Sequence, residues 1–135
     1  MTRNLTGLWV GEYRYPTGSV HPQTFAPLLS VSFKAQITDQ GGAFYGEITE
    51  DNAPGAHIRG TREGSSVTFS KRYSDTGGGR YLDRIVYEGG LNEDNTRMDG
   101  TWMILRGLTR PGAFFMMREK PGAREVDVER EAEIV

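Results

Sequence analysis

Hydrophobic and polar residues alternate along most of this chain, and the alternation has the period of β-strands. Successive side chains of a strand point to opposite faces, so a two-residue period predicts a strand with one buried face. Helical spacing does not persist anywhere in the sequence. The alternation defines eight segments, at residues 7–15, 28–38, 43–51, 56–63, 66–74, 81–91, 96–106 and 113–118.

The connections between these segments are alternately short and long. Three are tight-turn sequences, Asp-Gln-Gly-Gly, Glu-Gly-Ser-Ser and Asn-Glu-Asp-Asn. The longer connections lie at residues 16–27, 52–55, 75–80 and 107–112. Alternate connections of an up-and-down barrel fall at opposite ends, and closure leaves no unpaired edge strand. We therefore predict an all-β fold, an eight-stranded antiparallel up-and-down β-barrel with one end closed by turns and one edged by larger loops.

The composition narrows the classes of function. A chain of 135 residues is expected to form one domain, and its net charge of −2 gives no electrostatic reason to bind nucleic acid. The absence of cysteine excludes disulfides, zinc–thiolate sites and thiol catalysis. No apolar run approaches the roughly 20 residues that a membrane-spanning helix needs. We expect a cytoplasmic protein that binds neither membrane nor nucleic acid.

The last residues differ in composition from the rest. We assign residues 1–118 to the barrel domain and residues 119–135 to an acidic tail with six acidic and three basic residues. A frayed terminus is one interpretation. The alternation at Val126 and Val128 also allows a ninth strand or a subunit contact, and a short helix over residues 124–133 is a third option.

The first and last predicted strands carry residues suited to closing the barrel. If Trp9 points inward, it lies at the closed end, where the last strand brings Arg118. The guanidinium would then cover the indole ring and donate hydrogen bonds to carbonyls of residues 4–7. A Gly-x-Trp on the first strand with a basic residue from the last strand resembles the calycin superfamily, which includes the lipocalins, fatty-acid-binding proteins and avidins. That resemblance implies a ligand-binding barrel.

Within the calycins the chain is most similar to the avidin family. The matching segments are LTGLW (5–9), GAFYGEI (42–48), IRGTRE (58–63), VTFSKRY (67–73), YEGGL (87–91) and MDGTWMIL (98–105). Avidins hold the ureido oxygen of biotin with an Asn, Ser and Tyr triad. Gly11, Tyr15 and Ile48 stand at the corresponding positions, so we expect a barrel that does not bind biotin.

The aromatic wall of the avidin site is partly kept. Phe69 replaces a fifth-strand Trp, whereas Tyr87 and Trp102 match aromatic residues of the sixth and seventh strands. The stretch GLWVGEYRYPTG (7–18) also resembles the nitrobindins, whose haem histidine lies near the C-terminus. This chain has no histidine after His57, so we expect no haem and no other cofactor.

The alternation assigns an inward side to each predicted strand, and most inward residues are apolar and predict the core. These are Val31, Phe33, Ile37, Phe44, Ile48, Ile58, Val67, Phe69, Tyr87, Met98, Trp102, Ile104, Phe114 and Met116.

Polar residues also point inward, towards the end with the longer loops: Tyr13, Tyr15, Glu50, Lys71, Tyr73 and Asp83. Charges in a small interior are costly unless they are paired or hydrogen-bonded. Either Glu50 or Asp83 can pair with Lys71, with phenols adding hydrogen bonds. Alternatively these residues lie beyond the rim in water, or a bulge reverses the alternation.

No motif indicates catalysis or a metal. The glycine-rich stretch DTGGGR (75–80) follows a strand and opens no helix, so it lacks the helix N-terminus of a phosphate-binding loop. His21 and His57 could form a metal site only with Asp51 or Glu50, and their spacing matches no fixed ligand pattern. We interpret both histidines as surface residues and expect no metal.

Three functions remain. The first is a binding protein for a small apolar or aromatic ligand with a polar end. The second is an interaction module with a filled barrel, forming homo-oligomers through outward Tyr45, Val86 and Met103. The third is an isomerase- or cyclase-like enzyme using Lys71, although we name no catalytic residue. The candidate ligand-binding residues are Tyr13, Tyr15, Glu50, Phe69, Lys71, Tyr73, Asp83, Tyr87, Trp102 and Phe114.

Overall fold

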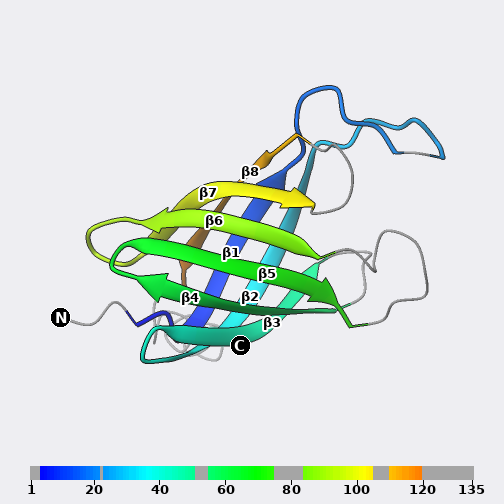
Figure 1. Cartoon of the computed structure of the whole chain (residues 1–135). Helices are drawn as coiled ribbons and strands as arrows, with labels where there is room; N and C mark the ends of the chain where they lie inside the picture. Colours follow the sequence, from blue (N-terminus) through cyan, green and yellow to red (C-terminus); the bar gives the residue numbers. More distant parts are fainter. Residues whose placement is uncertain (1–3, 22, 51–54, 75–83, 105–109, 120–135) are drawn as a thin grey trace, which may run out of the picture.

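The eight predicted strands form one closed sheet. The computed structural model describes residues 4–21, 23–50, 55–74, 84–104 and 110–119. The strands are β1 (Gly7–Arg14), β2 (Ser30–Gln40), β3 (Ala43–Glu50), β4 (Ala56–Glu63), β5 (Ser66–Tyr73), β6 (Ile85–Leu91), β7 (Arg97–Ile104) and β8 (Gly112–Arg118). Each pairs antiparallel with the next, and β8 pairs with β1, as Figure 1 shows. The predicted up-and-down barrel is confirmed.

The second strand differs most from its predicted bounds, because it starts and ends two residues later. Leu28 and Leu29 belong instead to the connection, where the Leu28 N–H donates to Ser19 and the Leu29 carbonyl accepts from Tyr15. At its other end β2 runs to Gln40 before a tight turn. The remaining strands keep their predicted bounds to within a residue wherever both ends are described. Residues 51, 81–83, 105–106 and the tail from residue 120 lie outside the described residues.

Glycines make room inside the barrel for large side chains of the neighbouring strand. Gly60 lies opposite Phe69, and a Cβ at Gly60 would stand 2.4 Å from the Phe69 Cβ. Gly112 lies opposite Trp102, and a Cβ there would stand 2.4 Å from the indole nitrogen. Pairing a small residue with a large one lets rings interdigitate in a narrow interior. Six of the described glycines are packing residues of this kind, whereas five others have positive φ.

The core is the interior of the barrel. Twelve of the fourteen apolar residues assigned inward are buried, and Val31 and Ile104 are half-buried against them. The alternation therefore holds along the described strands. Further buried apolar residues complete the core: Leu5, Trp9, Tyr13, Ala35, Ala56, Tyr73, Ile85 and Leu91.

The closed end is sealed by Trp9 and Arg118. Trp9 is fully buried, and its indole N–H donates to the Leu5 carbonyl at 2.9 Å. The Arg118 guanidinium lies 4.6 Å from the centre of the Trp9 ring and donates to the carbonyls of Asn4 and Thr6 at 2.6 and 2.7 Å. Strand β8 thus fastens the segment before β1 across the seam, in the arrangement that the sequence suggested.

A second contact at the closed end joins the β2–β3 turn to β4. The Asp39 carboxylate accepts hydrogen bonds from the backbone of Leu5 and Gly42, each at 2.9 Å, and from the Arg62 side chain at 2.9 Å. Burial alone would raise the pKa of Asp39, but the hydrogen bonds from Arg62, Leu5 and Gly42 outweigh it and lower that pKa. This carboxylate therefore stabilises the fold in its charged form.

Replacing Asp39 by Asn is expected to lower the unfolding free energy at neutral pH by about 1.5–3 kcal/mol, because charge-assisted hydrogen bonds are lost. A lowered folded-state pKa stabilises above the unfolded value of about 3.9, and the contribution disappears as pH falls through the folded value. The difference between the two proteins should therefore shrink in strong acid. Urea unfolding across that pH range measures it. Asp99→Asn, which breaks an exposed pair with Arg97, is the control and should have little effect.

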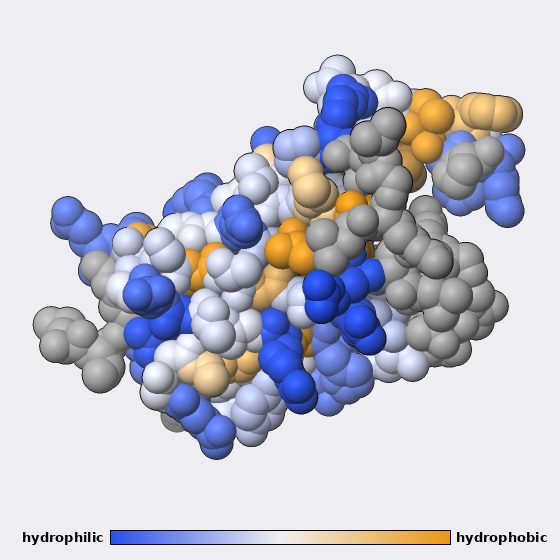
Figure 2. Space-filling model, viewed as in Figure 1, coloured by the Kyte–Doolittle hydropathy of each residue, from blue (hydrophilic) through white to orange (hydrophobic). Residues whose placement is uncertain are grey.

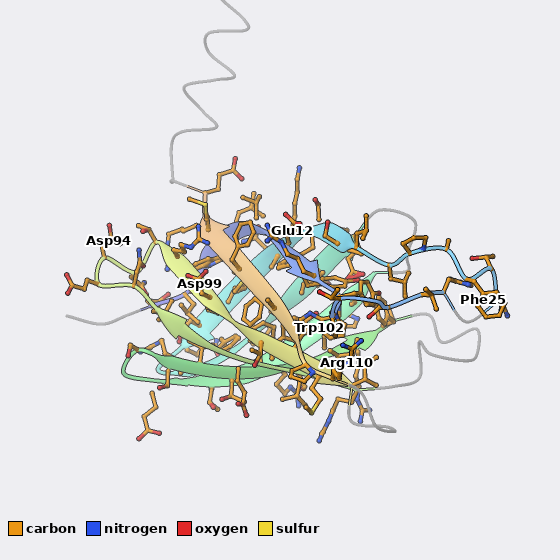
Figure 3. All side chains as sticks on the ribbon, turned by 90° about the horizontal axis from the view of Figure 1, so that it is seen from above. Glu12, Phe25, Asp94, Asp99, Trp102 and Arg110 are labelled. Atoms are coloured by element: carbon orange, nitrogen blue, oxygen red, sulfur yellow. The ribbon has the colours of Figure 1, made fainter. Side chains whose placement is uncertain are left out.

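The β1–β2 connection extends from the barrel as an arm (Figure 1), described at residues 15–21 and 23–29. Its two sides are joined by a Val20–Pro27 bridge and by the His21 N–H donating to Ala26. Phe25 lies at the tip, labelled in Figure 3, with 73% of its surface exposed and a positive φ of 59°. The arm marks the end of the barrel opposite the tight turns, and we call this end the open end.

Candidate functional site

A buried ion pair lies inside the barrel near the open end. The Lys71 ammonium on β5 is 2.6 Å from a Glu50 carboxylate oxygen at the end of β3, and each side chain is 1% exposed. Both were expected to point inward, and the structure pairs Lys71 with Glu50. Asp83, the alternative partner, lies outside the described residues. These two side chains therefore do not lie beyond the rim in water.

Tyrosine rings surround the lysine. The Lys71 nitrogen lies 4.4 Å from the ring centre of Tyr13, 5.0 Å from that of Tyr73 and 5.5 Å from that of Tyr87. Ring faces carry partial negative charge and attract an ammonium ion, more strongly where water is excluded. The tyrosines and Glu50 together replace the water that the Lys71 ammonium loses on burial.

The phenols extend the ion pair into a hydrogen-bonded chain. The Tyr73 hydroxyl donates to Glu50, 2.8 Å from one carboxylate oxygen and 3.2 Å from the other. The Tyr13 hydroxyl donates in turn to Tyr73. The Glu50 carboxylate therefore ends a chain of hydrogen bonds in which both phenols are donors.

Burial controls the ionisation of these groups. It lowers the pKa of Lys71, an effect that Glu50 opposes, and it raises the pKa values of Tyr13 and Tyr73 far above their usual range. Both tyrosines are therefore protonated hydrogen-bond donors at any ordinary pH. A buried lysine with a lowered pKa is the kind of group that acts as a base or forms an imine, but the Glu50 carboxylate occupies this one.

Two residues of the predicted aromatic wall, Phe69 and Tyr87, lie below the ion pair together with Phe114, whereas the third, Trp102, lies with Tyr13 and Tyr15. Phe69 and Tyr87 are stacked, with ring centres 4.7 Å apart and planes inclined by 4°. Phe114 meets both edge-on, at 5.9 and 5.1 Å. Because these three rings pack directly against one another, they form a floor beneath the ion pair. The described part of the interior is thus packed with side chains up to the level of Lys71.

A second aromatic group lies above that floor, at the end of the barrel where the arm begins. Trp102 donates its indole N–H to the Arg14 carbonyl at 3.1 Å, and it meets Tyr13 and Tyr15 edge-on at 5.4 and 5.3 Å. Figure 3 shows Trp102 at the end of the barrel that faces away from Asp94. Tyr15 is half-buried, as are Val31 and Ile104. These half-buried residues form the rim of the site.

The structure therefore gathers nine of the ten candidate ligand-binding residues around one axis, in two layers. The lower layer holds Phe69, Tyr87 and Phe114, and the upper layer holds Tyr13, Tyr15, Glu50, Lys71, Tyr73 and Trp102.

Sequence reasoning missed two charged groups. Asp39 was assigned to a turn, and its contact with Arg62 depends on how the turn folds back over the closed end. A row of basic residues on the outer face of β4 and β5 was also missed. The Glu-Gly-Ser-Ser turn fixes the register of that hairpin, and this register places His57 opposite Arg72. The signal was therefore present in the sequence.

The two histidines lie in different parts of the fold and have different surroundings. His57 is exposed on the outer face of β4, whereas the His21 ring nitrogen Nδ1 accepts hydrogen bonds from the backbone of Gln23 and Thr24 in the arm. Within the described ranges, no three His, Cys, Asp or Glu side chains cluster as metal ligands would.

Sequence comparisons with known proteins find no match. The chain matches no protein-family model and no curated protein sequence. Over the described residues, no helix has the length and apolar character needed to cross a lipid bilayer.

Proposed function

We propose that the protein is a calycin-like binding barrel for a small apolar or aromatic molecule with a polar end, and that this molecule is not biotin. The Gly7-x-Trp9 closure covered by Arg118 supports the calycin relationship. The absence of the avidin polar triad argues against biotin. The open end, with its aromatic rim over a polar cluster, supplies the proposed site.

The Lys71–Glu50 pair is the observation that carries this proposal. Taking two charges out of water is costly, and a well-packed apolar pair is often equally stable or more so. A pair that is 1% exposed is therefore weak support for stability, and its place directly under the rim suggests another role. Ligand sites are commonly apolar cavities with a few converging polar groups.

The layers of the site suggest how the ligand lies. Its ring or chain would pack on half-buried Tyr15 and on Trp102, whose ring centres lie 5.3 Å apart. Its polar end would point down towards Glu50 and Tyr73, which are hydrogen-bonded to each other. The ligand is therefore expected to lie at the rim, with the stacked rings beneath it as a floor.

Native mass spectrometry of the full chain, at low and then raised activation energy, tests the proposal first. A co-purified ligand is expected as an excess mass that is lost on activation. A fluorescence titration with N-phenyl-1-naphthylamine, a neutral aromatic amine, is then expected to show saturable binding. Removing the rim ring by Tyr15→Ala should weaken that binding by about tenfold, as loss of an aromatic contact of about 1.4 kcal/mol would.

Met103→Ala is the matched control, because Met103 follows Trp102 on β7 but faces outward and is 40% exposed. It should leave the titration unchanged. The absence of both excess mass and saturable binding would contradict the proposal, and so would equal losses in the Tyr15 and Met103 variants.

A filled barrel that acts as an interaction module is the second candidate. The mutual contacts of Phe69, Tyr87 and Phe114 favour it, since they leave the lower interior solid. Tyr45 and Met103 are exposed on the outer face, at 49% and 40%. The same mass spectrum separates the two functions: an oligomer without excess mass favours the interaction module.

A further inference from the structure

Four basic side chains lie together on the outer face of the barrel, whereas the proposed ligand site lies inside it. His57 and Arg59 come from β4, Arg72 comes from β5, and Arg84 immediately precedes β6. All four residues are exposed. Figure 2, which views this side of the barrel, shows strongly hydrophilic side chains gathered here beside the open end. We call these four residues the basic cluster.

The strand register brings these basic residues next to one another, with the charged pair Arg72 and Arg84 side by side. His57 is the direct cross-strand neighbour of Arg72, and the pairing of Lys71 with Ile85 brings Arg84 alongside Arg72. Like charges at opposed positions of a sheet destabilise it. Arg59 lies two residues from His57 on the same outer face of β4. The fold thus accepts an unfavourable arrangement at this place.

Among the described residues, no carboxylate forms an ion pair with Arg59, Arg72 or Arg84 of the cluster. Glu47 is the cross-strand neighbour of His57 on its β3 side, and it forms no ion pair with that histidine. Arginines that converge on one place without an ion-pair partner among the described residues are suited to bind an anion, since each presents planar N–H groups that match phosphate oxygens.

The basic cluster lines a groove of about 510 Å³. Tyr45 forms one wall, with 49% of its surface exposed, and Ser70 adds a hydroxyl between the arginines. An exposed tyrosine beside arginines offers a ring for stacking next to donors for phosphate. The groove therefore combines the two features that recognise a flat ring joined to an anionic group.

We propose that this groove is a second binding site, and that it takes a nucleoside phosphate. The phosphate would accept hydrogen bonds from Arg59, Arg72 and Arg84, and the base would stack on Tyr45. A small molecule is favoured over a nucleic acid strand because the cluster occupies one bounded groove and the whole chain has a net charge of −2. This site is separate from the ligand site inside the barrel and does not depend on it.

Isothermal titration calorimetry of the full chain at low ionic strength tests the site with adenosine 5′-monophosphate, adenosine and inorganic phosphate. Adenosine 5′-monophosphate is expected to bind more tightly than either part. The double variant Arg72→Gln/Arg84→Gln should weaken it by at least about tenfold, because charge-assisted hydrogen bonds are lost. Tyr45→Ala should weaken the nucleotide but leave phosphate unchanged. In NMR spectra, the backbone amide chemical shifts of residues 57–59 and 70–72 should change when the nucleotide is added.

Arg14→Gln is the matched control, since Arg14 is an exposed arginine on β1, outside the cluster. It should change the affinity less than about twofold. If the Arg14 variant lost as much nucleotide affinity as the double variant, general charge attraction would explain the binding, and the proposed site would be overturned. Absence of nucleotide binding would overturn it too. Equal affinity for phosphate and nucleotide, or far tighter binding of a single-stranded oligonucleotide, would overturn the ligand class. Thermal melts identify any variant that fails to fold, and Arg59→Gln alone then repeats the test.

Discussion

Replacing Glu50 by alanine is expected to cost the barrel about 3–5 kcal/mol of its unfolding free energy, because Lys71 is then buried without a counter-ion. The Lys71 side chain is 1% exposed and its nitrogen is 2.6 Å from Glu50. The three tyrosine rings around the ammonium are a weaker substitute for a carboxylate. Tyr73 would also lose its acceptor. Urea unfolding at neutral pH, followed by circular dichroism, measures the loss.

The double variant Glu50→Leu/Lys71→Met separates loss of a charge partner from loss of packing. It fills similar volume with apolar groups and leaves no buried charge, so it should recover most of the stability lost in the single variant. A Glu50→Ala protein within about 1 kcal/mol of the parent would show that water reaches the ammonium in solution. If the double variant is stable but no longer binds the aromatic probe, the pair serves the ligand site.

Gly100→Ala is expected to destabilise the barrel by about 3 kcal/mol or more, or to prevent folding. A Cβ at Gly100 would stand 1.9 Å from the carbonyl oxygen of Glu88 and 2.6 Å from the Cα of Gly89. Both atoms belong to the backbone of β6, so no side chain can rotate away. Strands β6 and β7 would have to separate, and the hydrogen bonds of a closed sheet resist this. Guanidinium unfolding measures the change.

Gly90→Ala is the matched control on the neighbouring strand. Gly90 lies opposite Asp99, next to Gly100, but a Cβ there would meet nothing closer than the Ser65 carbonyl at 3.9 Å. Its effect should lie within about 1 kcal/mol of zero, with stabilisation expected because alanine restricts the unfolded chain. Similar large losses in both variants would show that any strand glycine matters and that close approach at Gly100 is not the cause.

Much of this fold follows from local pattern in the sequence. A two-residue period is a local property, so it located the strands and assigned the inward face at almost every apolar position. The same alternation placed Lys71 and Glu50 in the interior. Because Trp9 opens the first strand and Arg118 ends the last, barrel closure alone was enough to bring them together at one end.

The remainder depends on three-dimensional details that no alternation encodes. The sequence could not show that tyrosine rings surround the Lys71 ammonium, because Tyr13 and Tyr87 come from other strands and their contact depends on side-chain geometry. The alternation also cannot say how full the interior is, since the stacking of Phe69 on Tyr87 depends on how closely neighbouring strands approach. The Asp39 contact required knowledge of the turn, where the two-residue period ends.

The pairing of β1 with β8 also has a consequence for biosynthesis. Every other pairing joins strands that are consecutive in the chain, so each of these hairpins can form soon after its second strand leaves the ribosome. The seam cannot form until β8 has been made, at residues 112–118. Until then β1 is an unpaired edge, the kind of surface on which incomplete β-sheets aggregate. Glu12 and Arg14, which face outward on that strand, supply charge to the edge throughout this interval.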